Sequence, residues 1–229
     1  MSADCRDLDS LDRWEAQFAS WCVDQPTDAA HDLEHLRRVA TVARRLAADE
    51  GAALEVVIPA AWLHDCVYVA KDSPDRARAS QLSAEHAVRL LVDWGYPFSR
   101  YEDIAHAIEA HSFTAAIPAR TIEARVVRDA DRLDAIGAVG LARCLGLGGA
   151  MGRELYSTND PFCRERAPDD RRFTVDHFYA KLLTLESTMQ TVAGRAEAAR
   201  RTAFLQGFLD QLALEIGREW TGFQDFAED

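Results

Sequence analysis

The chain has 229 residues, of which 48% are hydrophobic and 28% are charged. This composition excludes a collagen-like, low-complexity or disulfide-dominated protein. The 38 acidic residues outnumber the 26 basic ones and give a formal net charge of -12, which opposes non-specific binding to nucleic acid or to an anionic membrane. A small anionic ligand is not excluded, because a local site can oppose the overall field.

The sequence contains no targeting or membrane signal that we recognise. No apolar run approaches the roughly 20 residues of a membrane helix, and the first ten residues are acidic and polar rather than a secretion signal. The five cysteines are an odd number, widely scattered and without a CxxC pair. We therefore expect reduced thiols and a cytoplasmic location.

Helical periodicity dominates the N-terminal half. Apolar residues recur at spacings of three and four, and no alternating run typical of a strand is present. The stripes predict helices that begin near Leu8, near His35 and at Leu54, the last one running to about Cys66 and containing an awkward Pro59. Further helices are expected over about Ala79–Trp94, after the capping box that starts at Ser99, and from Thr121.

The C-terminal half reads in the same way. Six glycines between Gly137 and Gly152 indicate a close-packed helix followed by a turn. Residues Arg153–Arg172 are polar and rich in arginine and predict a long loop. Val175 to about Ile216 predicts two helices or one bent helix. The sequence therefore predicts one all-α domain over residues 1–229, a helical bundle with C-terminal helices packed on it.

Four polar side chains lie on helix faces that should be buried. His35 starts an apolar stripe, the pair His64-Asp65 closes an apolar helix, and Asp131 stands among valine, alanine and leucine. Burying a carboxylate costs several kcal/mol unless it is paired or bound to a metal. Convergence of the four groups on one cation would offset that cost.

The types of ligand restrict the ion. Two imidazoles and two carboxylates suit Mn²⁺, Fe²⁺, Co²⁺, Ni²⁺ or Zn²⁺ and, more weakly, Mg²⁺. We expect one divalent ion and take Mn²⁺ as the first choice. Successive residues of a helix point about 100° apart. We therefore expect His64 and Asp65 at a helix end, where both can reach one ion.

These residues and their neighbours resemble a known family. His35 in "HDLEHLRRVA", the pair in "AAWLHDCVY" and Asp131 in "VVRDADRLDAIGAVGLAR" are similar to the H…HD…D signature of the HD-domain metal-dependent phosphohydrolases. The likeness is closest to small single-domain bacterial members, whose characterised examples hydrolyse nucleotides. It implies an HD core at residues 31–135, with residues 136–229 completing the pocket.

The resemblance also assigns roles. It implies that His35, His64, Asp65 and Asp131 bind the metal, with His31 as a rival for His35. It implies a charged group in the loop after the pair. The predicted catalytic residues are Asp65, His64, Asp72 and His111.

Substrate-binding residues are predicted from their charge. Phosphate needs cations, and Lys71 and Lys181 are the only lysines in the chain. Arg38 and His177 complete the predicted set. Three aromatic residues could stack on a base, namely Trp94, Tyr96 and Phe113, but an aromatic residue in an all-α core more often serves packing.

The sequence thus predicts a cytoplasmic hydrolase that holds one divalent ion and acts on a small phosphorylated molecule, most plausibly a nucleotide, by attack of metal-activated water on phosphorus. Binding to duplex nucleic acid or membrane is not expected, and homodimerisation is left open. Two alternatives are a non-catalytic metal- or nucleotide-binding module and a di-iron oxygenase, for which His86 and His111 are the spare ligands.

Overall fold

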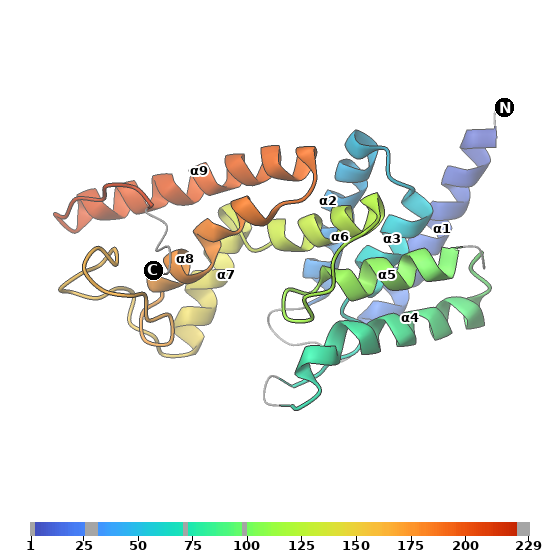
Figure 1. Cartoon of the computed structure of the whole chain (residues 1–229), viewed down its shortest axis with the longest axis horizontal. Coiled ribbons are helices and arrows are strands. Elements are labelled where there is room, and N and C mark those ends of the chain that lie inside the picture. Colours follow the sequence, from blue (N-terminus) through green and yellow to red (C-terminus); the bar gives the residue numbers. More distant parts are fainter. Residues whose placement is uncertain (1–2, 26–31, 71–72, 98–99, 224–229) are drawn as a thin grey trace. The chain divides into compact units, whose positions relative to one another are not determined.

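The computed structural model describes residues 3–25, 32–70, 73–97 and 100–223 (Figure 1). Helices dominate these ranges, and the described residues form no strand beyond one isolated bridge between Glu154 and Phe173. The all-α prediction is confirmed.

The chain separates into two compact units. The first contains residues 1–131 and 190–193, and the second contains residues 132–189 and 194–229. One boundary falls inside α6 (Ile122–Leu133) and another near the start of α9 (Val192–Glu215). Single-domain organisation remains a prediction, and each unit is described by itself.

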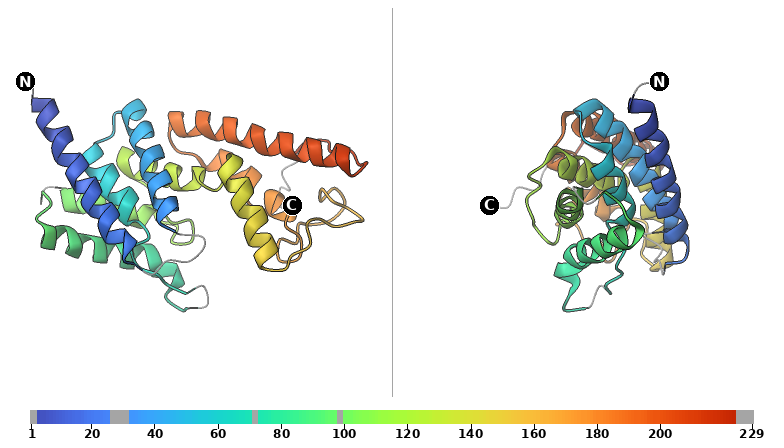
Figure 2. Two further views of the ribbon diagram at one scale, coloured as in Figure 1. Left: turned by 180° about the vertical axis from the view of Figure 1, so that it is seen from behind. Right: turned by 90° about the vertical axis from the view of Figure 1, so that its right-hand side faces the viewer.

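The first unit is built around an almost entirely buried helix. α3 (Leu54–Leu63) packs against α1 (Ala3–Val23), α2 (Leu33–Glu50) and α5 (Tyr101–His111). α4 (Ala79–Trp94) lies alongside α5, as both views of Figure 2 show. Every side chain of α3 from position 56 to 63 is buried, which explains why that helix is apolar all round rather than amphipathic.

Local signals fix where these helices begin and end. The Asp32 side chain caps α2 by accepting a hydrogen bond from the His35 backbone N–H at 2.8 Å. Gly95 ends α4 in the left-handed conformation, as the sequence predicted. α3 ends at Leu63, earlier than the expected Cys66, so His64 is its C-cap residue. The predicted placement of the His-Asp pair at a helix end is confirmed.

The second unit contains α7 (Gly137–Ala150), the short α8 (Asp176–Ala180), two 3-10 turns (Leu182–Thr184 and Glu186–Thr188) and most of α9. Gly148 of α7 permits a close approach, because an added Cβ would lie 2.3 Å from the hydroxyl of Thr174.

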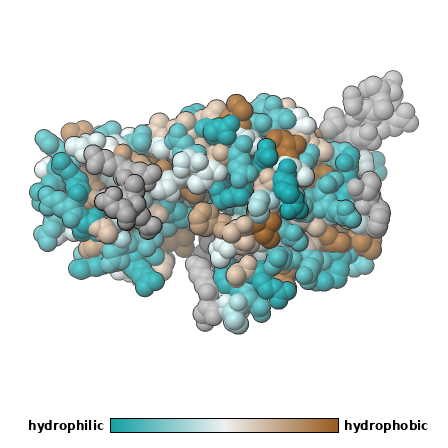
Figure 3. Space-filling view, in the orientation of Figure 1, coloured by the Kyte–Doolittle hydropathy of each residue, from teal (hydrophilic) through white to brown (hydrophobic). Residues whose placement is uncertain are grey.

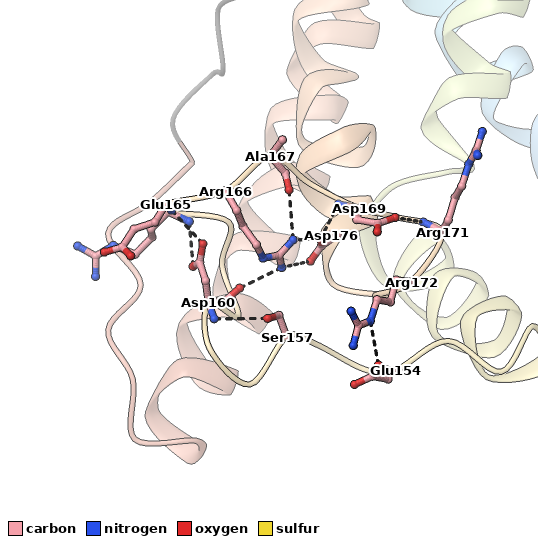
Figure 4. Close-up of polar contacts among 11 residues, drawn as sticks. Glu154, Ser157, Asp160, Glu165, Arg166, Ala167, Asp169, Arg171, Arg172 and Asp176 are labelled. Carbon is pink, nitrogen blue, oxygen red and sulfur yellow. Dashed lines mark hydrogen bonds and ion pairs between the residues drawn. The ribbon is translucent and has the colours of Figure 1, made fainter.

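A long loop precedes α8, as predicted. Two guanidinium nitrogens of Arg166 donate to the fully buried carboxylate of Asp176, and the Asp169 backbone N–H donates to the same carboxylate at 2.7 Å (Figure 4). Asp160 accepts the backbone N–H groups of Arg164 and Glu165, each at 2.9 Å. Side chains thus replace the ladder hydrogen bonds that this segment lacks.

The surface carries no broad apolar band on the face drawn in Figure 3, where hydrophobic side chains occur in small groups among hydrophilic ones. Among the described residues, no single helix is long and apolar enough to span a membrane, and only α6 and α7 taken together as a bent pair meet that criterion.

Asp129 of α6 fixes the start of α9 within the first unit. Its carboxylate is fully buried and accepts the backbone N–H groups of Gln190 and Thr191 at 3.0 and 2.8 Å, as well as the Thr191 hydroxyl at 2.8 Å. These bonds satisfy the amides that stand just before the first turn of α9.

We predict that Asp129→Ala lowers the free energy of unfolding by about 2–3 kcal/mol, because buried N–H groups lose their acceptor. Urea unfolding in EDTA measures this without a contribution from metal. Asp93→Ala is the matched control, since Asp93 is exposed on α4. Equal stability of the two variants would contradict the anchoring role.

Candidate metal site

Five polar residues of the first unit meet at the ends and faces of its helices. His35 lies on α2, His64 and Asp65 follow α3, His111 is the last residue of α5, and Asp131 lies on α6. The three imidazoles are buried, whereas the side chains of both aspartates retain 29% of their exposure. One side of this group is therefore sealed by the core and the other is open to water.

The distances fit ligands of a shared ion. His35 Nε2 and His64 Nε2 lie 3.5 and 3.8 Å from Asp131 Oδ1. His64 Nε2 lies 3.5 Å from Asp65 Oδ2, and His111 Nε2 lies 3.6 Å from Asp65 Oδ1. Two atoms that each bind one ion at about 2.1 Å are about 3.0–4.2 Å apart.

The possible ligand atoms form two overlapping groups of three. His35, His64 and Asp131 make one group, and His64, Asp65 and His111 make the other, with all ligand atoms of a group within 4.8 Å of one another. The structure thus brings the four predicted metal ligands into one cluster around His64 and adds His111 to it.

The hydrogen bonding of His64 assigns its proton. Nδ1 lies 2.8 Å from the Ala61 carbonyl oxygen, which only accepts, so Nδ1 carries the hydrogen and Nε2 has a free lone pair. Burial lowers the pKa of His64 to about 4, so the ring is neutral at physiological pH. This is the protonation state that a metal ligand requires.

The surroundings of His64 Nε2 fit a cation. This atom is buried and has no hydrogen-bond donor among the described residues. Its lone pair faces the carboxylate oxygens of Asp65 and Asp131. Lone pair and carboxylates repel one another in the absence of positive charge, and a divalent ion between them turns this repulsion into coordination. The residues present therefore fit a bound metal.

His111 is suited either to bind the metal or to carry a proton. Its Nδ1 lies 2.6 Å from the Ile108 carbonyl oxygen, so its Nε2 is directed at Asp65. Burial alone would lower the pKa of His111, but the hydrogen bond and charge of Asp65 raise it above the usual value. The inward orientation predicted for His111 is confirmed, and its Nε2 can serve either as a ligand or as a proton carrier.

Other predicted site residues lie elsewhere or outside the described ranges. His31, Lys71 and Asp72 belong to the segments that the structure does not describe. His86 of α4 packs on Trp21, with ring centroids 5.9 Å apart, and belongs to neither group of ligands.

The predicted substrate-binding residues of the C-terminal half lie in the second unit. Lys181 is exposed directly after α8, and His177 Nδ1 lies 2.8 Å from Asp170 Oδ2. Asp134, on the same unit, forms an ion pair of 2.6 Å with Arg143. The roles of Lys181 and His177 remain predictions.

Arg128 is a cation that the sequence analysis missed. It stands three residues before Asp131 on α6, and residues at this spacing are neighbours on a helix surface. Its Nε atom is buried and has no hydrogen-bond partner among the described residues. Burial lowers the pKa of Arg128, and the charge of Asp129 offsets this only in part. No residue type or spacing singles Arg128 out, because the signal is a buried Nε atom without a hydrogen-bond partner.

Comparison with known proteins identifies the family. Residues 32–136 match the HD domain, and the chain is 35% identical over 206 residues to YpgQ, an uncharacterised protein of Bacillus subtilis, covering 87% of this chain and 92% of YpgQ. The chain belongs to the HD-domain family, which confirms the resemblance found in its motifs.

Solved structures that resemble this chain support the same family. A crystal structure of Bacillus subtilis YpgQ in complex with ADP matches with a TM-score of 0.69 at 35% identity, covering 88% of this chain and 97% of that one. An HD-superfamily hydrolase from Bacillus thuringiensis matches with a TM-score of 0.71 at 29% identity, covering 91% and 100%. The fold is that of an HD-superfamily hydrolase.

We predict that Mn²⁺ raises the melting temperature of the wild type relative to EDTA, and that His64→Ala and Asp131→Asn abolish the rise. An ion at 100 times its Kd stabilises a folded protein by about 2.7 kcal/mol. Thermal unfolding with and without metal measures this, and calorimetry should give one ion per chain.

His86→Ala and Asp93→Asn are the matched controls, because they remove an imidazole and a carboxylate outside the cluster. Both should retain the metal-dependent rise. A rise that persists in His64→Ala and Asp131→Asn would place the ion elsewhere, and a ratio near two would favour the di-iron alternative.

Proposed function

We propose that this protein is a metal-dependent phosphohydrolase that acts on a nucleotide. The observation that carries the proposal is the buried His64 Nε2, unprotonated and facing two carboxylates on the open side of the site. A relative at 35% identity was crystallised with ADP, which supports a nucleotide as the ligand.

The chemistry follows from the ligand set. A divalent ion bound there supplies a Lewis acid for a phosphoryl oxygen and makes water acidic enough to attack at neutral pH. The partial exposure of Asp65 and Asp131, against the burial of the histidines, leaves the carboxylate side accessible to substrate and water.

Asp65 and His111 are suited to move the proton. Asp65 Oδ1 lies 3.6 Å from His111 Nε2, and although burial opposes it, the hydrogen bond and charge of Asp65 raise the pKa of His111 above its usual value. We propose that a proton released in the reaction passes from Asp65 to His111 Nε2. Asp72 remains an alternative catalytic group.

We propose that two arginines of the first unit bind phosphate. Arg38 follows His35 by three residues on α2, and Arg128 precedes Asp131 by three on α6, so each is one helical turn from a proposed ligand. Guanidinium groups pair well with phosphate oxygens. Lys71, Lys181 and His177 remain further proposals for the same task, and the scattered cysteines support a cytoplasmic location.

Substitution of the proposed ligands tests the reaction. We predict that Asp65→Asn and His64→Ala lower kcat for a nucleotide in Mn²⁺ by at least about 10³-fold, equivalent to about 4 kcal/mol of barrier. Steady-state release of phosphate or pyrophosphate from a nucleotide panel is the measurement, with Asp93→Asn as the matched control.

Equal rates in Asp65→Asn and the wild type would refute the proposal. A wild type that binds metal and nucleotide but turns over no nucleotide would instead identify the protein as a non-catalytic binding module.

The role of Arg128 has its own test. We predict that Arg128→Gln raises KM for a nucleotide about 10- to 100-fold, because a charge-assisted hydrogen bond is worth about 1.5–3 kcal/mol. Arg89→Gln controls for the loss of charge, since Arg89 is exposed on α4. An equal KM in the two variants would exclude Arg128 from the binding of phosphate.

A further inference from the structure

The helix α9 exposes an apolar face. It is 24 residues long, and residues 194–215 of it belong to the second unit (Figure 1). One face is buried and includes Leu205 and Leu209. On the other side of the helix Phe204 is 50% exposed and Leu214 is 74% exposed. The exposed face of a helix in a globular protein normally carries polar residues, so this one resembles a second packing surface.

Six exposed residues run along the middle of this face, and we refer to them as the seam. They recur at alternating spacings of four and three residues, which is the repeat along which two helices pack in a coiled coil. The residues of the seam are Ala196, Arg200, Ala203, Gly207, Asp210 and Leu214. Most of them are small or apolar, which lets the backbone of another helix approach closely.

Gly207 stands near the centre of the seam. A glycine inside an exposed helix costs about 1 kcal/mol relative to alanine. Apart from its own helix backbone and its chain neighbours, no heavy atom lies within 4 Å of the position that its Cβ would occupy. The packing of this chain therefore does not require a glycine there. A second helix against the seam would require one, because glycine permits a close approach of two backbones.

The charges of α9 are divided between its two halves. Residues 192–203 contain three arginines and one glutamate, whereas residues 204–215 contain two acidic residues and no basic one. An isolated helix prefers the reverse order, with anions near its N-terminus and cations near its C-terminus. An antiparallel second copy of α9 offsets this cost, because each positive half then lies beside a negative half. A parallel copy would instead place like charges side by side.

The seam is symmetric about position 205, and this symmetry fixes the register of an antiparallel pair. A two-fold axis at this position makes the interface isologous, so that every contact between the copies occurs twice. The seam residues that then face each other across the two copies are Arg200 and Asp210, Ala203 and Gly207, and Ala196 and Leu214. Both oppositely charged contacts and the closest backbone approach thus arise in one register.

Arg200 is able to make a contact with a second copy. Its side chain is 71% exposed, and its ion pair with Glu197 uses only Nε and one terminal nitrogen, at 3.0 and 2.8 Å. A guanidinium group has five N–H donors. The pair with Glu197 therefore leaves donors of Arg200 for the carboxylate of Asp210, which is exposed as well.

We propose that α9 binds a second copy of this chain, packed antiparallel along the seam, with Arg200 of each copy paired to Asp210 of the other. The charge order of the helix favours this occupant over an unrelated protein, because each half of α9 is complementary to the other half of an identical helix. The inference goes beyond the proposed function and does not depend on it, since no residue of the seam belongs to the metal cluster.

The test is an exchange of charges, measured by sedimentation equilibrium over a series of protein concentrations. The wild type should show an equilibrium between monomer and dimer. Arg200→Asp and Asp210→Arg should each weaken association at least about tenfold, because each change creates two contacts between like charges. An equimolar mixture of the two variants should recover the dimer, because the charges are then opposite at both contacts.

The matched controls are Arg89→Asp and Asp93→Arg, which change exposed charges of α4 in the same way. Both should associate like the wild type. Recovery in the mixture also shows that the two variants are folded, since misfolded chains would not regain a specific contact.

Three outcomes overturn the inference. A wild type that is monomeric at every concentration would leave the exposed face of α9 to a different protein. A dimer that neither Arg200→Asp nor Asp210→Arg weakens would place the contact elsewhere on the chain. Weakened association in both variants without recovery in their mixture would refute the pairing of Arg200 with Asp210.

Discussion

The site depends on an electrostatic conflict inside the first unit. His64 Nε2 has a lone pair and lies 3.5 and 3.8 Å from oxygens of two carboxylates. All three groups are rich in electrons, and the nitrogen lies in the buried core, where screening by water is weak. A divalent cation resolves the conflict, so the arrangement is stable when it is filled and costly when it is not.

The helices of the first unit hold these electron-rich groups in position. α3 is apolar on all sides and is buried. His64, which follows its last residue, is therefore buried as well, whereas Asp65 at the helix end stays partly exposed. The Ala61 carbonyl oxygen fixes the tautomer of His64, and the Ile108 carbonyl oxygen does the same for His111. Helix carbonyl oxygens therefore keep the hydrogen on Nδ1 of both rings, which leaves each Nε2 able to bind a metal ion or a proton.

Much of the fold was predictable because it follows from periodicity. The spacing of three and four residues specified helices, and Gly95 specified the end of α4. The position of the His-Asp pair followed from geometry, since two adjacent residues can share an ion only at a helix end. The early end of α3 at Leu63 did not follow, because the apolar sequence continues past the last helical residue.

The environment of the site was less predictable, since it depends on contacts between distant segments. Trp94, Tyr96 and Phe113 look alike in sequence, and only tertiary packing distinguishes a core ring from an exposed one. Arg128 was missed for the same reason, because the burial of its Nε atom without a hydrogen-bond partner cannot be read from spacing. Lys181 was predicted from its charge and its rarity, and its role remains a prediction.

Anomalous diffraction from crystals soaked in Mn²⁺ is the most direct test of the central claim. The account predicts a peak within about 2.0–2.4 Å of His64 Nε2 and of an oxygen of Asp131, with Asp65 or His35 completing the set. A peak remote from His64, or none at saturating metal, would contradict it.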